Sequence, residues 1–198
     1  MIDINTLATA GIEQSMHAMR NPMDSWEKGD TGGGKVGPAD RALTEKLIHA
    51  GTEHAKHLRL CVVWADITAP LYWWKEFDTY RAGVEKVSCS TMHTITKKPF
   101  DRTMFSGEVE PGAVHWLEVQ RQAYLSADTA DGKAVYWRRI IENLPSGFYQ
   151  RRTVMMSYAA LRQMYRQRNG HKLTEWHVFR AWAAGLPEGW MITEGADD

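Results

Sequence analysis

The stretch Leu58–Arg81, with the sequence LRLCVVWADITAPLYWWKEFDTYR, decides the predicted fold of this chain. In its first half, apolar residues at even positions from Leu58 to Trp64 alternate with the residues between them. This period of two predicts a β-strand that continues to about Ala69. Pro70 follows at a position that suits the first turn of a helix, so the stretch predicts a strand that leads directly into a helix.

Helical spacing of apolar residues predicts several helices around this strand. The one after Pro70 carries Leu71, Trp74 and Phe77 at every third position, and Gly83 supplies its C-terminal stop. The others are expected at Ala39–His57 with Asp40 as a capping residue, from Pro111 through Tyr124, at Val135–Asn143, from the capping Ser157 to Arg168, and at Leu173–Ala184. An irregular segment rich in Ser and Thr runs to about residue 98. The predicted fold class is α+β and helix-rich.

Length and composition indicate one folded domain. The chain has 198 residues, of which 43% are hydrophobic and 24% charged, and this is enough to bury one core. We expect an N-terminal segment with a Gly-rich loop at 1–37, a core at 38–187 and a tail at 188–198. Lys plus Arg equals Asp plus Glu at 24 each, so no global basic excess favours binding to a nucleic-acid polymer.

Hydropathy and cysteine content predict a cytoplasmic protein with no membrane partner. The longest apolar runs, such as Leu60–Trp64, are far shorter than the roughly 20 residues that span a bilayer, and the N-terminus has no apolar signal core. Cys61 and Cys89 give no disulfide framework. The nine tryptophans indicate either an aromatic core or subunit interface, or stacking on a base or a flavin.

Two motif-like patterns have simpler structural interpretations. Gly29–Lys35 matches the spacing of a phosphate-binding loop, but Val36 stands where a Ser or Thr hydroxyl is needed. We therefore interpret Gly29–Gly37 as a flexible loop. His49, Glu53 and His57 would share one face of a helix, but their order is not that of an HExxH zinc motif. We predict a solvated or hydrogen-bonded face there, and no metal.

Two clusters of polar and basic residues favour anion binding. The first extends from Glu76 to Arg81 and continues with hydroxyl and imidazole groups at residues 88–93, which can donate to phosphate and sugar oxygens. The second consists of Arg151, Arg152, Arg162, Arg166 and Arg168. The alternatives are a capped, solvated helix end for the first cluster and a solvated helix face for Arg162–Arg168.

Together the clusters resemble flavin-dependent thymidylate synthases, and more closely a divergent phage-type set of that family. The stretch His49–His54 is similar to the family's segment ending in Glu-His, which precedes a strand and contributes to the flavin site. Ala69-Pro70 and the residues after it lead to Asp78–Arg81, which lies where the family has Arg-His-Arg. Val87–His93 resembles the segment that carries the nucleotide-contacting Ser, and Ser90 is the best match.

The resemblance continues to about Leu186. Leu144-Pro145 with Tyr149–Arg151 is similar to the family's strand whose Arg meets the substrate phosphate. Leu161, Arg168, His171 and Glu175-Trp176 resemble its C-terminal run, where the Arg contacts the pyrimidine.

The resemblance implies a fold, a reaction and a set of site residues. The fold is a central antiparallel sheet flanked by helices, assembled as a homotetramer with active sites between subunits. The reaction moves a one-carbon unit from methylene-tetrahydrofolate to C5 of a pyrimidine deoxynucleotide monophosphate, dUMP, with FAD and NADPH as further cofactors. The implied catalytic residues are Arg168 and Ser90, the substrate-binding ones Glu76, Arg81, Ser88, Ser90, Arg151 and Arg168, and the cofactor-binding ones Glu53, His54, Thr79, Tyr80 and Arg81.

The chain departs from the family pattern at three positions. Thr79 and Tyr80 replace an Arg and a His, and Met92 stands where another Arg is expected. These departures leave two alternatives open: C5 methyl or hydroxymethyl transfer to dCMP or another pyrimidine, and a non-enzymatic nucleotide-binding protein. For a phage-encoded protein the expected compartment is the host cytoplasm.

Overall fold

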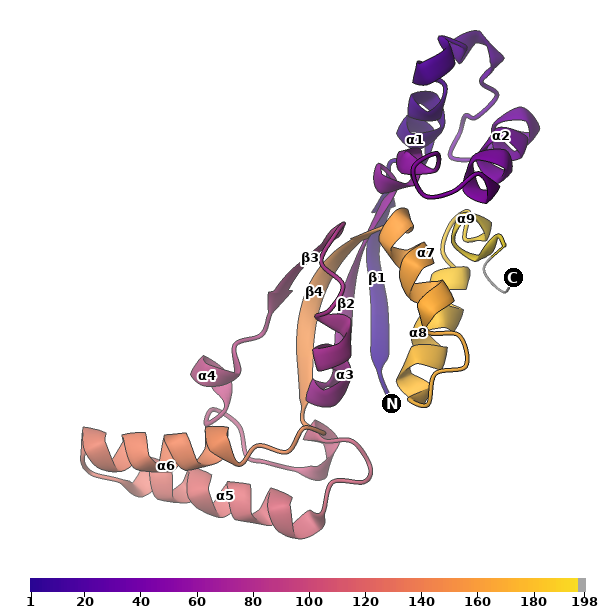
Figure 1. The fold of residues 1–198 in the computed structure, drawn as a ribbon. Helices are drawn as coiled ribbons and strands as arrows, with labels where there is room; N and C mark the ends of the chain where they lie inside the picture. The colour runs from indigo at the N-terminus through magenta and orange to yellow at the C-terminus, as the bar shows by residue number, and fades with distance from the viewer. Residues whose placement is uncertain (196–198) are drawn as a thin grey trace. The chain divides into compact units, whose positions relative to one another are not determined.

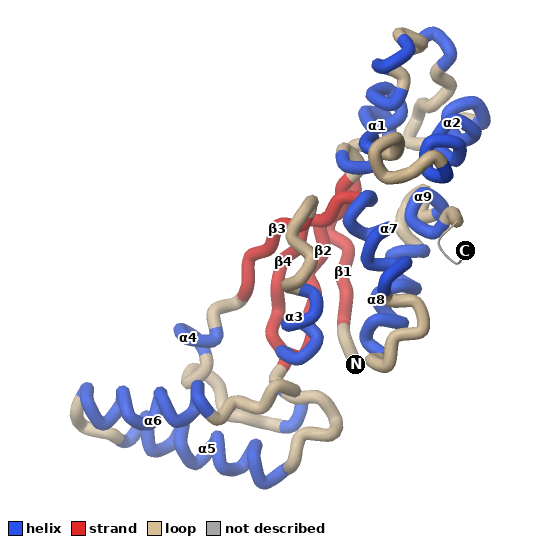
Figure 2. Tube along the Cα trace, in the orientation of Figure 1, coloured by secondary structure: helices blue, strands red, loops and turns tan. Residues whose placement is uncertain are grey.

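The computed structural model describes residues 1–195, and the chain packs as two compact units. Unit 1 consists of Met1, Thr68–Thr79 and Val87–Arg152, and unit 2 contains Ile2–Ile67, Tyr80–Lys86 and the chain from Thr153 onward. A four-stranded antiparallel sheet has the strand order β1-β2-β4-β3 (Figure 2). The strands are β1 Asp3–Ala10, β2 Val62–Pro70, β3 Val84–Ser88 and β4 Tyr149–Ser157. This architecture confirms the predicted α+β class.

Unit 1 contains a helical hairpin with its own apolar core. The helices α5 (Pro111–Ser126) and α6 (Ala130–Glu142) pack along each other (Figure 1). The shorter helices are α3 (Leu71–Phe77), α4 (Thr91–Thr94) and a 3-10 turn at Arg102–Met104. The core beneath the hairpin consists of Ile95, Phe100, Phe105, Val114, Leu117, Ile140 and Phe148. Pro111 at the start of α5 confirms the predicted position of this helix.

Unit 2 has an N-terminal and a C-terminal group of helices. The N-terminal helices are α1 (Ile12–Met19), α2 (Pro38–His49) and 3-10 turns at Asn21–Met23, Trp26–Lys28 and Lys56–Arg59. The C-terminal helices are α7 (Tyr158–Gln167), α8 (Thr174–Ala184) and α9 (Trp190–Thr193). Ser157 caps α7 by accepting from the Ala160 N–H, and Gly185 ends α8, as predicted.

Strand β2 buries the face opposite to the one that the apolar alternation indicated. The buried positions are the odd ones, Cys61, Val63, Ala65 and Ile67, which are 0% exposed. On the other face Trp64 is 36% exposed, and Leu60, just before the strand, is 52% exposed. The odd positions are apolar throughout, whereas the even positions continue with Asp66 and Thr68, so polarity over the whole strand favours burial of the odd face.

The predicted helix at Ala39–His57 is too long at its C-terminal end. Helix α2 ends at His49, and Gly51 follows with φ 115°, a left-handed conformation that glycine adopts without strain. Similarly, α3 ends at Phe77 rather than near Gly83, and the segment expected to be irregular contains β3 and α4. Strand β1 and helix α1 were not predicted.

The start of α2 is capped by Asp30 rather than by Asp40. The Asp30 carboxylate accepts hydrogen bonds from the N–H groups of Ala39 and Asp40, at 2.8 and 2.9 Å. Asp40 is buried and forms an ion pair with Arg20, with N and O atoms 2.6 Å apart. Burial alone would raise the pKa of Asp40, but hydrogen bonds from Thr31 and Arg20 outweigh it and hold this pKa below its usual value.

The glycine-rich loop is tied to the rest of unit 2. Its tip forms a β-bridge between Gly32 and Lys35. The Gly34 N–H donates to Glu13 at 2.8 Å, and the Val36 N–H donates to Glu188 at 3.2 Å. These amide groups are held by carboxylates rather than directed at a phosphate, which agrees with rejecting a phosphate-binding loop.

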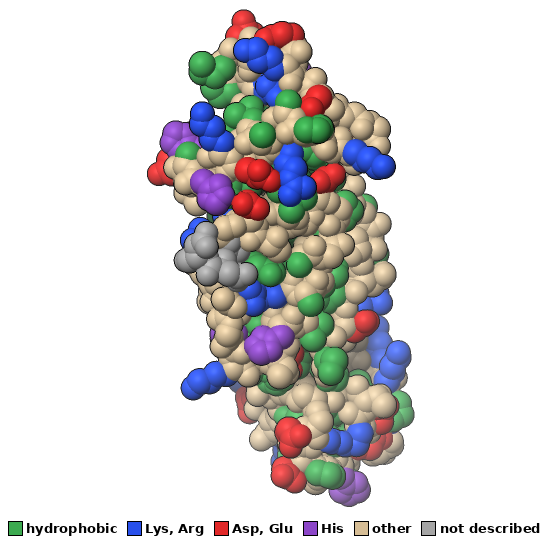
Figure 3. All heavy atoms as spheres, turned by 90° about the vertical axis from the view of Figure 1, so that its right-hand side faces the viewer, with side chains coloured by type: hydrophobic (Ala, Val, Ile, Leu, Met, Phe, Trp, Pro, Cys, Tyr) green, Lys and Arg blue, Asp and Glu red, His purple; other side chains and the backbone are tan. Residues whose placement is uncertain are grey.

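No helix among residues 1–195 is long and apolar enough to cross a membrane. Basic and acidic side chains are interspersed on the face drawn in Figure 3.

Candidate active site

The C-terminal end of α7 positions Arg168, and four side chains meet there in unit 2. The Arg168 Nε donates a hydrogen bond of 2.9 Å to the Tyr80 hydroxyl oxygen. The guanidinium carbon lies 4.5 Å from the centroid of the Trp176 ring and 5.4 Å from that of Tyr80. Trp176 is 0% exposed and Tyr80 is 8% exposed, so the cation lies on a buried aromatic platform. The end of a helix also favours a positive charge.

His171 is the fourth member of this group. Its Nε2 atom lies 3.1 Å from Arg168 Nη1, and its Nδ1 lies 3.1 Å from the Leu173 backbone nitrogen. Both neighbours are donors, whereas a neutral imidazole has only one acceptor nitrogen. A neutral His171 can therefore accept from Arg168 or from the Leu173 N–H, but not from both at once. The tautomer of the ring decides which of these two hydrogen bonds forms.

The sequence assigned Tyr80 to the cofactor, and the structure gives it a different neighbour. Its ring is almost fully buried, and its hydroxyl accepts from Arg168. The hydroxyl is therefore engaged inside unit 2, and the cofactor role of Tyr80 stays a prediction. Tyr80 and Arg168 are 88 residues apart in the chain and in direct contact, a pairing that the sequence did not predict.

The other predicted residues of unit 2 are exposed. Arg81 follows Tyr80 directly, and its guanidinium has no ion-pair or hydrogen-bond partner among residues 1–195. Glu53 and His54 lie in the turn between α2 and the following 3-10 helix. A backbone hydrogen bond within Glu53 and one from Thr52 hold the pKa of the Glu53 carboxyl below its usual value, so it is ionised at neutral pH.

Unit 1 holds a second arginine network, around Arg152, a member of the predicted basic cluster whose contacts the sequence did not predict. The Arg152 guanidinium donates to Asp78 at 2.8 Å and to the side chain of Gln150 at 3.0 Å, and it lies 4.2 Å from the centroid of the Trp74 ring. The Trp74 indole N–H in turn donates to the Gln150 carbonyl oxygen at 2.9 Å. Because side chains alternate along β4, the neighbouring Arg151 points to the opposite face and is exposed.

Arg151 lies beside the predicted serine segment. The Cys89 backbone N–H donates to the Arg151 carbonyl oxygen at 2.9 Å, so β4 brings Arg151 next to Ser88 and Ser90. The Ser90 hydroxyl caps α4 by accepting a long hydrogen bond of 3.4 Å from the His93 N–H, and Ser88 is exposed at the end of β3. The Arg151 guanidinium has no hydrogen-bond or ion-pair partner within the described part of the chain.

Two further predicted residues, Glu76 and Thr79, meet at the end of α3. The Thr79 hydroxyl donates to the Glu76 carbonyl oxygen at 2.7 Å, which ends the helix. Thr79 is exposed and Glu76 is partly buried. The structure therefore groups the predicted residues by unit, with Glu76, Thr79, Ser88, Ser90 and Arg151 in unit 1 and Glu53, His54, Tyr80, Arg81 and Arg168 in unit 2.

The sequence favoured a solvated helix face for Arg162–Arg168, and only part of this segment is exposed. Arg162 is half-buried and donates to the Ile192 carbonyl oxygen at 3.2 Å. Burial lowers the pKa of its guanidinium below the usual value. Arg166 is exposed, as a solvated face requires.

The His49, Glu53 and His57 set does not share a face. His49 is at the end of α2 and lies 3.1 Å from Glu194, Glu53 is exposed in the following turn, and His57 is buried. Among residues 1–195, no group of three His, Cys, Asp or Glu side chains could hold a metal ion.

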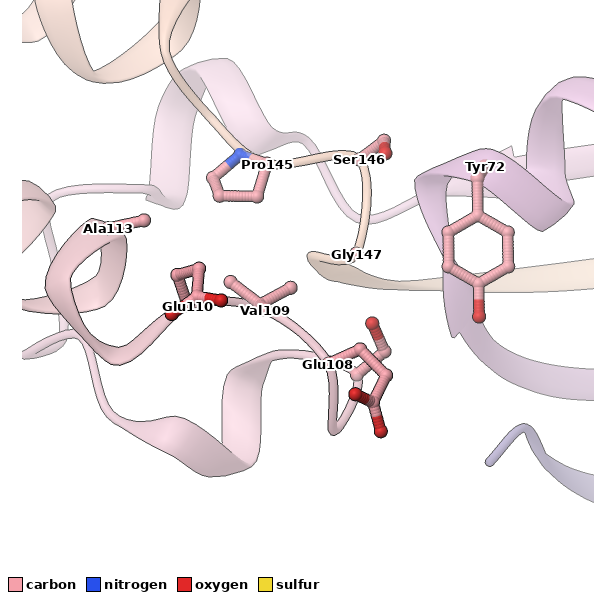
Figure 4. Close-up of a pocket in the computed structure, with 9 residues that line it drawn as sticks. Tyr72, Glu108, Val109, Glu110, Ala113, Pro145, Ser146 and Gly147 are labelled. Atoms are coloured by element: carbon pink, nitrogen blue, oxygen red, sulfur yellow. The ribbon is translucent and has the colours of Figure 1, made fainter.

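A shallow hollow of about 330 Å³ opens in unit 1 beside the start of α5 (Figure 4). Its lining is mostly apolar, with Glu108 and Glu110 among the residues around it, and it consists of Tyr72, Ser106, Glu108, Val109, Glu110, Ala113, Pro145, Ser146 and Gly147. None of the predicted site residues lines it.

Comparison of the sequence with protein-family models and with curated proteins gives no match. Among solved structures, the chain is similar to thymidylate synthase X (ThyX) from Helicobacter pylori crystallised with FAD and dUMP, with a TM-score of 0.76, 15% identity and 99% of both chains covered. A second crystal structure, of flavin-dependent thymidylate synthase ThyX from Helicobacter pylori complexed with FAD and dUMP, has a TM-score of 0.73, 16% identity and 96% coverage of both chains. At this identity the likeness shows the fold, so the chain has the fold of flavin-dependent thymidylate synthases.

Proposed function

We propose that this protein is a thymidylate-synthase-like transferase that moves a one-carbon unit from methylene-tetrahydrofolate to C5 of a pyrimidine deoxynucleotide monophosphate. The observation that carries the proposal is Arg168, held on Trp176 and Tyr80 at the end of α7. The similar structures were crystallised with FAD and dUMP, which supports dUMP as the first nucleotide to test. A fixed cation of this kind can polarise a ring carbonyl as negative charge develops on the pyrimidine.

Two exposed arginines are suited to the nucleotide phosphate. Arg151 and Arg81 lack protein partners among the described residues, and a guanidinium binds phosphate oxygens through paired N–H donors. Ser88 and Ser90, which lie next to Arg151 through the β3–β4 pairing, add hydroxyl groups that orient the nucleotide. Ser90 has no general base assigned to it, so we give it an orienting role and not a nucleophilic one.

The exposed groups of unit 2 are chemically suited to FAD. The Arg81 guanidinium and the His54 imidazole can donate to a pyrophosphate, and the ionised Glu53 can accept from ribose hydroxyl groups. Bound and reduced, FAD supplies hydride to the transfer reaction, with NADPH as its reductant. In the proposal the chain's own groups bind and orient the two nucleotides, in a cytoplasmic homotetramer whose active sites lie between subunits.

The proposal is tested by titrating dUMP into the parent protein and three variants by calorimetry. Arg151→Ala should weaken binding roughly ten- to a hundredfold, because a charge-assisted phosphate contact contributes about 1.5–3 kcal/mol. Arg168→Lys should lower kcat more than binding, because its contact strengthens only as charge develops. Arg138→Ala is the matched control, since this arginine is a surface residue of α6 with a side chain 75% exposed.

Equal affinity for dUMP in the parent, Arg151→Ala and Arg138→Ala would remove Arg151 from the phosphate site. If the protein binds and converts dCMP instead of dUMP, the proposed substrate is wrong but the proposed class of reaction stands. Light scattering tests the assembly, since a monomer at micromolar concentration would contradict sites that are built between subunits.

A further inference from the structure

Tyr80 stands where the resembling family has a histidine, and its side chain is directed at Arg168 rather than at solvent. We propose that Tyr80 is a positioning residue: its hydroxyl fixes the orientation of the Arg168 guanidinium. This inference rests on the proposed function, in which Arg168 acts on the pyrimidine ring. It assigns a role to a residue that the sequence placed in the cofactor site.

Stacking and hydrogen bonds restrain the guanidinium, whose Nη1 atom also lies 3.1 Å from His171 Nε2. The guanidinium carbon lies over the Trp176 ring, 4.5 Å from the ring centroid, so the group stacks on the plane of this ring. Stacking alone leaves the group free to rotate within that plane. The hydrogen bond from Nε to the Tyr80 oxygen, at 2.9 Å, removes this rotation because Nε carries a single N–H in a fixed direction.

Tyr80 is itself held in place. Its ring meets Trp176 edge to face, with centroids 6.1 Å apart, and only 8% of the residue is exposed. The phenol oxygen accepts the hydrogen bond without carrying a charge, so it orients Arg168 and does not neutralise it. A pre-oriented cation loses less entropy when it binds the charge that develops in a reaction.

The contact is tested first without any ligand. In parent protein labelled with ¹⁵N-arginine, the Arg168 Nε–H should give a resonance protected from hydrogen exchange, assigned by its loss in Arg168→Lys. Tyr80→Phe should abolish this protection. Tyr165→Phe is the matched control, because Tyr165 also lies under an arginine, with the Arg180 guanidinium 4.1 Å from its ring centroid, outside the proposed site. Protection that survives in Tyr80→Phe overturns the proposal.

The kinetic test separates positioning from folding. Tyr80→Phe should lower kcat roughly tenfold, the size expected for one charge-assisted hydrogen bond, with little change in KM for dUMP. In the Arg168→Lys background, Tyr80→Phe should cause no further loss, because the group that it positions is gone. Losses that multiply in the double variant would show that Tyr80 acts independently of Arg168 and would overturn the proposal.

The two tests distinguish failure of the inference from failure of the proposed function. Absence of turnover in the parent with every pyrimidine nucleotide refutes the proposed reaction. The Nε resonance still reports in that case whether Tyr80 holds Arg168. Turnover in the parent with an unchanged kcat in Tyr80→Phe leaves the function standing and refutes the role of Tyr80.

Discussion

Lowering the pH should destabilise the fold through one buried histidine, His57. It lies in the 3-10 helix at Lys56–Arg59, is 5% exposed, and neither ring nitrogen has a hydrogen-bond partner among residues 1–195. Its carbonyl oxygen accepts from the Ser15 hydroxyl at 2.8 Å, which fixes the backbone of the turn. Burial lowers the pKa of the imidazole from 6.5 to about 4, because the charged form would lose its hydration.

The sign and size of the effect follow from this pKa difference. Between pH 6.5 and about 4 the unfolded chain takes up a proton at His57 that the folded chain does not, so the free energy of unfolding falls as the pH falls. The full difference is about 3 kcal/mol, at about 1.4 kcal/mol per pH unit. The contribution lost relative to neutral pH is about 1.4 kcal/mol at pH 5.5 and about 2.5 kcal/mol at pH 4.5.

Urea unfolding at pH 7.5, 5.5 and 4.5 measures this loss. Other groups also titrate in that range, so the informative quantity is the difference between the parent and His57→Met, an apolar residue of similar length. The variant should be at least as stable as the parent at pH 7.5 and should lack the loss of about 2.5 kcal/mol at pH 4.5. His54→Gln, a change at an exposed neighbour, should follow the parent. An identical pH dependence in the parent and His57→Met would refute this reasoning.

Two other perturbations test what holds each unit together. Asp40→Asn leaves the buried Arg20 without its counter-charge and should lower the free energy of unfolding by about 3–5 kcal/mol. Glu45→Gln, the control, breaks an exposed ion pair and should lower it by about 0.5 kcal/mol or less. Equal losses for the two variants in urea unfolding would contradict the burial argument. Arg152→Lys keeps the positive charge but loses the planar stacking and the two-pronged hydrogen bonds of a side chain that is 13% exposed. The free energy of unfolding, measured by thermal unfolding, should fall by about 1–3 kcal/mol. An unchanged melting temperature would show that the network does not stabilise the fold.

Local signals predicted several helix ends correctly. Pro111 begins α5, Ser157 caps α7 and Gly185 ends α8, and each acts through its own backbone or side chain. The strands were harder to predict. In β1, most residues are exposed, so the sequence DINTLATA has no apolar face to reveal, and β3 has a single buried residue, Val84.

The sequence named candidate site residues but not the contacts between them. The sequence singled out both Tyr80 and Arg168, since each lies in a recognisable segment, yet no local pattern indicates that a phenol will accept from a guanidinium 88 residues away. The sequence placed Arg152 in the basic cluster beside Arg151, but its contacts with Asp78 and Trp74 follow from the strand alternation that turns the two arginines to opposite faces. His57 was assigned to a helix face because the left-handed turn at Gly51 is not visible from apolar spacing.

The central claim is that this chain performs C5 transfer on a pyrimidine deoxynucleotide monophosphate. The most direct measurement is an anaerobic assay with dUMP, methylene-tetrahydrofolate and reduced FAD, followed by chromatography of the nucleotides. The account predicts the formation of dTMP by the parent protein, with turnover strongly reduced in Arg168→Lys. The account is contradicted if the parent protein forms no C5-substituted product from either dUMP or dCMP under these conditions.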